Sequence, residues 1–162
     1  MRHQHVFLNK NLGFRLLHQI DEIQGIGLHL DLVLRKIQDA YLRKFEDLGV
    51  DMTIEQWVIL HQVYELGDHA SQREIVQSNF RNRATISRII GGLERKKWIK
   101  KTRFKGDQKR FKLVLSPQGQ TIISLVLPEA QILRQKAVQN LSSEEFDGFL
   151  SVLEQIGENY SF

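Results

Sequence analysis

Apolar residues recur every three or four positions along most of this chain, which is the spacing of one face of a helix. A stripe over residues 30–48 ends at Gly49 and predicts a long helix with a glycine stop. Its members are Leu30, Val33, Leu34, Ile37, Tyr41, Phe45 and Leu48. A weaker stripe over residues 7–20 precedes it, and Gly25 and Gly27 loosen the join. The N-terminal region is therefore either two helices or one kinked helix.

Capping residues mark the helices that follow, because their side chains satisfy the free amides of a first turn. Residues 53–56 and 71–74 read Thr-Ile-Glu-Gln and Ser-Gln-Arg-Glu, so two short helices begin there and end near Gly67 and Asn79. The first presents an apolar stripe of Ile54, Trp57, Val58, His61 and Tyr64.

A third helix fits residues 82–97. It has an inward face of Ile86, Ile89, Ile90 and Leu93 and an outward face of Arg83, Ser87, Arg88 and Arg95. The pair Gly91-Gly92 inside it costs about 1 kcal/mol per glycine relative to alanine, which indicates close packing against a neighbour.

The period then changes to two, the period of a strand. Residues 99–104 and 110–115 predict a β-hairpin with a basic polar turn over residues 105–109, and Phe111, Leu113 and Leu115 share one side of the second strand. Ser116 and Pro117 open a helix that runs to about Asn140, and a capping box at residues 142–145 opens a last amphipathic helix. The predicted fold class is mainly α with a small β-hairpin, in a single domain over residues 1–162.

Positive charge is concentrated in one part of the chain. Residues 81–110 carry twelve Lys or Arg against Glu94 and Asp107, a net +10, while the rest carries −6 of the total +4. A charge run is usually only a solvated face. Segregation this strong within a folded pattern favours a polyphosphate partner, because each neutralised phosphate releases condensed counterions.

Several classes of protein are disfavoured. The chain has no cysteine, so a disulfide framework and thiolate chemistry are excluded. We expect a cytoplasmic protein, because there is no long apolar run and no signal-peptide core at the start. The six histidines lack metal-ligand spacing, and there is no phosphate-binding loop or nucleophile elbow. We therefore expect no metal, no cofactor and no enzymatic activity.

The order helix, helix, basic helix, basic hairpin is typical of a winged helix-turn-helix, in which the third element enters the major groove and the hairpin grips the backbone. The candidate DNA contacts on the basic helix are Arg83, Thr85, Ser87 and Arg88. Arg81 and Asn82 either join them or cap the helix. On the hairpin the candidates are Arg103, Lys105, Lys109 and Arg110.

This region resembles the MarR family. Residues 53–60 look like the opening of its second helix, residues 84–94 resemble its recognition helix, and residues 98–99, 107 and 115–119 (Leu-Ser-Pro-Gln-Gly) resemble its wing and wing exit. The similarity spans about residues 28–160. The family's wing has an acidic residue, one further residue and then arginine, whereas Lys109 occupies that position here. Either Lys109 substitutes for it, or the turn is one residue longer and Arg110 takes the role.

The resemblance implies an obligate dimer, in which helices of residues 1–48 and 117–162 form the interface around a DNA-binding lobe of residues 51–116. The apolar stripes at both ends favour this over the alternative that they close a monomer's core. It also implies a small aromatic effector, for which Tyr41, Phe45 and Trp57 are candidates unless they are core residues.

The predicted function is a sequence-specific transcription regulator, a repressor that binds a pseudo-palindromic operator on double-stranded DNA as a homodimer and is released by a small ligand. The alternative is an architectural DNA-binding protein with low sequence specificity.

Overall fold

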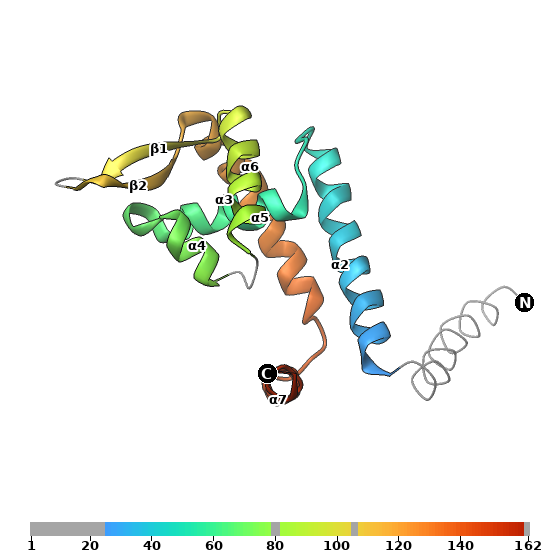
Figure 1. Ribbon diagram of the computed structural model, residues 1–162. Coiled ribbons are helices and arrows are strands. Elements are labelled where there is room, and N and C mark those ends of the chain that lie inside the picture. The colour runs from blue at the N-terminus through green and yellow to red at the C-terminus, as the bar shows by residue number, and fades with distance from the viewer. Residues whose placement is uncertain (1–24, 79–81, 105–106, 161–162) are drawn as a thin grey trace, which may run out of the picture. The chain divides into compact units, whose positions relative to one another are not determined.

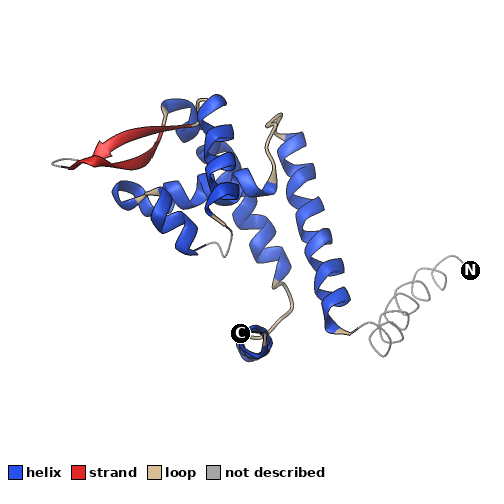
Figure 2. Ribbon diagram, viewed as in Figure 1, coloured by secondary structure: helices blue, strands red, loops and turns tan. Residues whose placement is uncertain are grey.

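The computed structural model describes residues 25–78, 82–104 and 107–160; of residues 104 and 107–110 it describes the backbone only. The chain divides into two units, residues 1–43 and 44–162. Figures 1 and 2 show helices and one hairpin in the described ranges, so the predicted fold class is confirmed. The elements are α2 (Ile26–Asp47), α3 (Ile54–Leu66), the 3-10 turn η1 (Gly67–His69), α4 (Gln72–Ser78), α5 (Arg83–Arg95), β1 (Ile99–Phe104), β2 (Asp107–Leu115), α6 (Pro117–Ala137) and α7 (Ser143–Asn159).

Helix α2 lies between two glycines that have left-handed backbone conformations. Gly25 precedes it with φ +73°, and Gly49 follows it with φ +66°. The amide of Gly49 donates to Glu46 and that of Val50 to Phe45, which is the Schellman pattern of a helix stop. Gly27 lies inside the first turn, so its predicted place in the join was wrong. The weaker stripe over residues 7–20 lies outside the described residues.

Helix α3 is the centre of the larger unit and packs against α5, α6 and β2. Its buried residues are Trp57, Ile59, Leu60 and Val63. The predicted stripe was therefore partly wrong, since Val58 and Tyr64 are 39% and 45% exposed. A helix with neighbours on several sides buries a broader face than a single stripe describes.

The predicted helix starts are confirmed. The Gln56 amide donates to Thr53 Oγ1 at 3.2 Å, and the Thr53 amide donates back to Gln56 Oε1 at 3.3 Å. Ser71 Oγ accepts from the Glu74 amide at 3.4 Å, whereas Glu74 Oε2 is buried without a hydrogen-bond partner among the described residues. The first capping box is thus reciprocal, and Glu74 Oε2 does not complete the second.

The hairpin pairs β1 and β2 in antiparallel register from Ile99 opposite Leu115 to Arg103 opposite Phe111, with an irregularity beyond Arg103. Strand β2 begins at Asp107, so the predicted turn over residues 105–109 was too long. The Leu113 amide donates to the Ala70 carbonyl at 2.8 Å, and the Leu113 side chain is buried. This bond fixes the base of the hairpin to the segment between η1 and α4.

Helix α6 begins against the end of α5. Ser116 is its N-cap and accepts from the Gly119 amide at 3.0 Å. The Ser116 amide donates to the Trp98 carbonyl at 3.0 Å. A Cβ on Gly119 would lie 1.9 Å from that same carbonyl oxygen, so the backbones touch at this position. α6 ends at Ala137, slightly before the predicted end.

Candidate nucleic-acid interface

Helix α5 has one face fixed in the core. Ile86, Ile90 and Leu93 are fully buried and Ile89 is 8% exposed, as predicted. Asn82 caps the helix, since its Oδ1 accepts from the Thr85 amide at 2.8 Å. Capping was one of the two predicted roles for this residue, whereas Arg81 lies outside the described residues. The buried isoleucines leave the helix little freedom to rotate about its axis.

The opposite face of α5 presents polar side chains to solvent. Arg83, Ser87 and Arg88 are exposed, and Thr85 is half-buried. Two guanidinium groups and two hydroxyls on one helix face can pair with base edges or phosphates, arginine bidentately with guanine. The structure therefore brings together four residues that the sequence predicted as DNA contacts.

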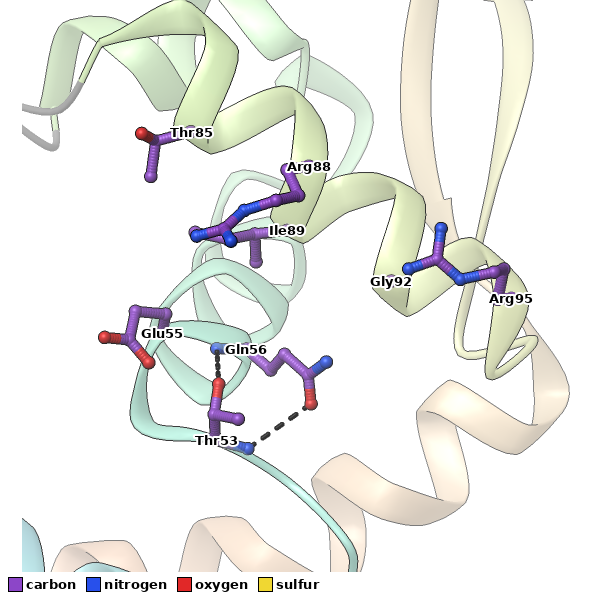
Figure 3. A pocket seen from close by; sticks show the side chains of 8 residues that line it. All are labelled: Thr53, Glu55, Gln56, Thr85, Arg88, Ile89, Gly92 and Arg95. Carbon is purple, nitrogen blue, oxygen red and sulfur yellow. Dashed lines mark hydrogen bonds between the residues drawn. The ribbon is translucent and has the colours of Figure 1, made fainter.

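A pocket of about 340 Å³ lies between this helix and the start of α3 (Figure 3). Its lining residues are Thr53, Glu55, Gln56, Thr85, Arg88, Ile89, Gly92 and Arg95. Arg95 extends back along its own helix, so that Cβ atoms on Gly91 and Gly92 would lie 3.6 and 3.8 Å from its guanidinium nitrogens. Long helical side chains point toward the N-terminus of their helix, so the approach of Arg95 to Gly91 and Gly92 follows from their spacing of four and three residues in the sequence.

Close packing at the glycine pair is confirmed at one of its two positions. A Cβ on Gly92 would lie 3.2 Å from Gln56 Nε2, a tight contact with α3. Gly91 meets only the Arg95 side chain, at ordinary contact distance. The lack of a side chain at Gly92 therefore allows α5 to pack closely against α3 at this position.

Three lysines in or just after the basic segment of residues 81–110 bind acidic groups within the protein. Lys96 Nζ lies 2.9 Å from Asp51 Oδ2, and Lys101 Nζ lies 2.8 Å from Glu94 Oε2. Lys112 Nζ lies 2.5 Å from Asp68 Oδ1, and this bond lowers the pKa of Asp68. The charge count along the sequence therefore overstates the positive charge available to a ligand.

The wing presents at least one cation near its turn. The Arg103 guanidinium lies 6.0 Å from the ring centre of Phe111, its partner on β2, and Phe111 is 49% exposed. An aromatic face attracts a guanidinium and limits the orientations it adopts. The side chains of Lys105, Lys109 and Arg110 lie outside the described residues, so the choice between Lys109 and Arg110 stays a prediction.

Comparison with known proteins identifies the lobe. Residues 50–110, which include α3, α4, α5 and most of the hairpin, match the family model described as MarR family. The lobe resembles the winged helix of the MarR family. No curated protein matches the chain.

Solved structures share the fold of this chain. The MepR–DNA complex of S. aureus superposes with a TM-score of 0.75 at 21% identity, covering 84% of this chain and 96% of the other. A putative MarR family transcriptional regulator from Listeria monocytogenes, complexed with a 26mer DNA, gives 0.69 at 22%, covering 85% and 89%. BpsR of Bordetella bronchiseptica, whose DNA binding is regulated by 6-hydroxynicotinic acid, gives 0.68 at 18%, covering 83% and 94%. At these identities the likeness establishes the fold.

Two of the three predicted effector residues are core residues. Phe45 and Trp57 are buried, with ring centres 6.2 Å apart, and Tyr41 is half-buried. The ring centre of His61 lies 5.2 Å from that of Trp57. Burial lowers the pKa of His61, the charge of Arg134 lowers it further, and Glu65 opposes both. The ligand role of Tyr41, Phe45 and Trp57 stays a prediction.

The described residues bear on two of the disfavoured classes of protein. Within them, no three His, Asp or Glu side chains gather in a group that could hold a metal ion. No helix in that part of the chain is long and apolar enough to cross a membrane. The family whose model matches residues 50–110 is a family of transcription regulators.

Proposed function

We propose that this protein is a sequence-specific DNA-binding transcription regulator that represses from a pseudo-palindromic operator as a homodimer and is released by a small ligand. The observation that carries the proposal is that helix α5 has a buried apolar face and an exposed polar face. Its isoleucine face is fixed in a MarR-type lobe, and its other face exposes Arg83, Ser87 and Arg88 together. We place this activity in the cytoplasm.

Two exposed apolar faces support the homodimer. In α2, Val33 and Leu34 are 56% and 50% exposed. In α7 no residue is buried, and Phe149 and Val152 are 50% and 54% exposed. Exposed stripes of this kind on amphipathic helices mark interfaces. A two-fold dimer would bury them and present two recognition helices about 34 Å apart, one turn of DNA.

Selection of genomic fragments by the purified protein tests the function. A regulator should recover a few sites with a repeated inverted motif and prefer them over bulk DNA by roughly 10³-fold or more. An architectural protein, the alternative, would recover fragments without a shared motif. Light scattering in the same buffer should return a mass of twice 19.0 kDa. A monomer mass would reject the dimer.

Arg88→Ala tests the recognition helix on the selected site. We expect roughly 10- to 100-fold weaker binding, concentrated at one base pair or phosphate of each half-site. Arg134→Ala removes the same charge from an exposed position on α6 and should change operator affinity little. If Arg88→Ala binds every duplex with wild-type affinity, α5 is not the recognition helix.

A groove on α6 supports the ligand-release part of the proposal. It has a volume of about 470 Å³ and lies between α6, Tyr64 of α3 and Leu115 at the end of β2. Its α6 lining includes Gln120, Ser124, Pro128 and Gln131, with Ile123 and Leu127. Pro128 has no amide hydrogen, so the Ser124 carbonyl one turn earlier lacks its helical donor. A groove with mixed polar and apolar lining and such an acceptor suits an uncharged aromatic ring that carries a hydroxyl.

Phenol and 6-hydroxynicotinic acid, added to the protein–operator complex, test the groove. We expect phenol to weaken operator binding. The acid carries a carboxylate and should therefore weaken operator binding less than phenol does. Ser124→Leu fills the exposed middle of the groove and should abolish the response, whereas Gln118→Leu, also exposed on α6, should retain it. A full response in Ser124→Leu would place the ligand elsewhere, with Tyr41, Phe45 and Trp57 the next site to test.

A further inference from the structure

Lys96 belongs by sequence to the basic segment, yet its ammonium group binds within the lobe. Nζ donates to the Asp51 backbone carbonyl, to Asp51 Oδ2 at 2.9 Å and to Gln56 Oε1 at 3.3 Å. An ammonium has three N–H donors and no acceptor. These three oxygens therefore use every donor, and none remains for a DNA phosphate.

One acceptor of Lys96 is itself held in place, and the other lies close to it in the chain. Gln56 Oε1 also accepts from the Thr53 amide in the capping box that starts α3, and Asp51 lies in the loop just before it. The Trp98 ring centre lies 5.0 Å from Nζ, within the range of a cation–π contact. Lys96 thus joins the end of α5, the start of α3 and the first residue before the wing.

The backbone at the end of α5 is equally constrained. The Trp98 amide donates to the Leu93 carbonyl at 3.0 Å and the Lys97 amide to Glu94 at 2.9 Å, which forms a Schellman motif. One turn earlier, Gly92 lies against Gln56 Nε2 closely enough that a Cβ would be 3.2 Å away. Gly92 and Lys96 therefore meet the same glutamine and hold this end of the helix on α3.

We propose that Lys96 is a positioning residue for DNA recognition, which acts through Gln56 and Asp51 to hold the angle of α5 and makes no contact with DNA. The inference rests on the proposed function. The side chains that read DNA lie on the first two turns of α5, so a tilt about its far end displaces them sideways. Bidentate pairing with a base is more demanding in geometry than neutralising a phosphate. Loss of Lys96 therefore lowers discrimination between sequences more than it lowers general DNA affinity.

Three full-length variants test this. Lys96→Met removes the charge and keeps the apolar stem, and Lys96→Arg keeps the charge but replaces three converging donors with a planar fork. Lys97→Met removes one charge from the adjacent exposed residue and is the matched control. Binding to the selected operator and to a scrambled duplex is measured across a salt series. We expect both Lys96 variants to lower the ratio of the two affinities roughly tenfold, the cost of about one mismatched base pair, with an unchanged salt slope.

A second measurement is made without DNA. Amide hydrogen exchange should be faster over residues 53–56 and 93–98 in Lys96→Met than in Lys97→Met, which shows the loss of the junction in the folded protein. Unchanged exchange there overturns the inference, whatever the DNA result.

A salt slope reduced by about one contact per subunit in Lys96→Met, with the ratio intact, would make Lys96 a phosphate ligand and also overturn it. If Lys96→Arg discriminates between the two duplexes as well as the wild type does, the inference is also overturned, because positive charge at this position would then be sufficient. If the wild-type protein prefers no duplex, the proposed function fails and the role in recognition with it, while hydrogen exchange still decides whether the junction exists.

Discussion

Replacing Gly119 with alanine should separate the wing from helix α6. The new Cβ would lie 1.9 Å from the Trp98 carbonyl oxygen and 2.8 Å from its carbon, both backbone atoms. Real Cβ contacts stay above 3.0 Å, so the two backbones must separate by about 1 Å. That separation strains the bond from the Ser116 amide to the Trp98 carbonyl.

The magnitude follows from two terms. Forcing an extra methyl group into a close-packed site costs about 1–3 kcal/mol, and more where backbone must move. Loss of the Ser116 hydrogen bond adds about 1 kcal/mol. We expect Gly119→Ala to lower the free energy of unfolding by about 2–4 kcal/mol, a large part of the 5–15 kcal/mol typical of a domain.

Urea unfolding followed by tryptophan fluorescence measures the effect, at one protein concentration because dimerisation contributes to stability. A loss of this size lowers the urea midpoint by roughly 1–3 M. Gly91→Ala is the control, since its Cβ meets only the flexible end of Arg95 at 3.6 Å. It should gain about 0.5–1 kcal/mol from helix propensity. A Gly119→Ala protein within about 0.5 kcal/mol of wild type would refute the close approach of α6 to Trp98.

Three further predictions concern the backbone, pH and the wing. Lys97 has φ +58°, so Lys97→Gly should raise the free energy of unfolding by about 1 kcal/mol. Lys100→Gly in β1 is the control and should lower it, and the urea midpoints of the two variants measure both changes. The folded protein lowers the pKa of His61 below 6.5, so the unfolded chain binds this proton more readily and stability falls as pH drops through 6.5. His61→Gln should remove part of that loss between about pH 7.5 and 5, and an identical pH profile would contradict it. Changing Lys109 and Arg110 together to Ala should weaken binding to all sequences alike and flatten the salt slope by about two contacts per subunit; an unchanged slope would mean that the wing does not grip phosphate.

Features that depend on three or four neighbouring residues could be predicted from the sequence. The capping boxes at Thr53 and Ser142, the start of α6 at Ser116 and the stop at Gly49 are all formed by groups within one helical turn of each other. The inward isoleucines of α5 follow in the same way, because helical period alone places them on one face. The exposed residues of the candidate interface on α5 were therefore predictable as well.

Other features depend on groups far apart in the chain, and only the tertiary structure decided them. The buried face of α3 is set by α5, α6 and β2, none of which its own periodicity describes. Lys96 and Lys112 count as free cations in a sequence, until folding places Asp51 and Asp68 beside them across 45 and 44 residues. By sequence, Gly119 is an ordinary glycine near the start of a helix. It cannot carry a side chain because the Trp98 carbonyl, from another part of the chain, occupies that space. Local chemistry thus determined where the helices begin and end, whereas long-range packing determined which charges and surfaces remain available for binding.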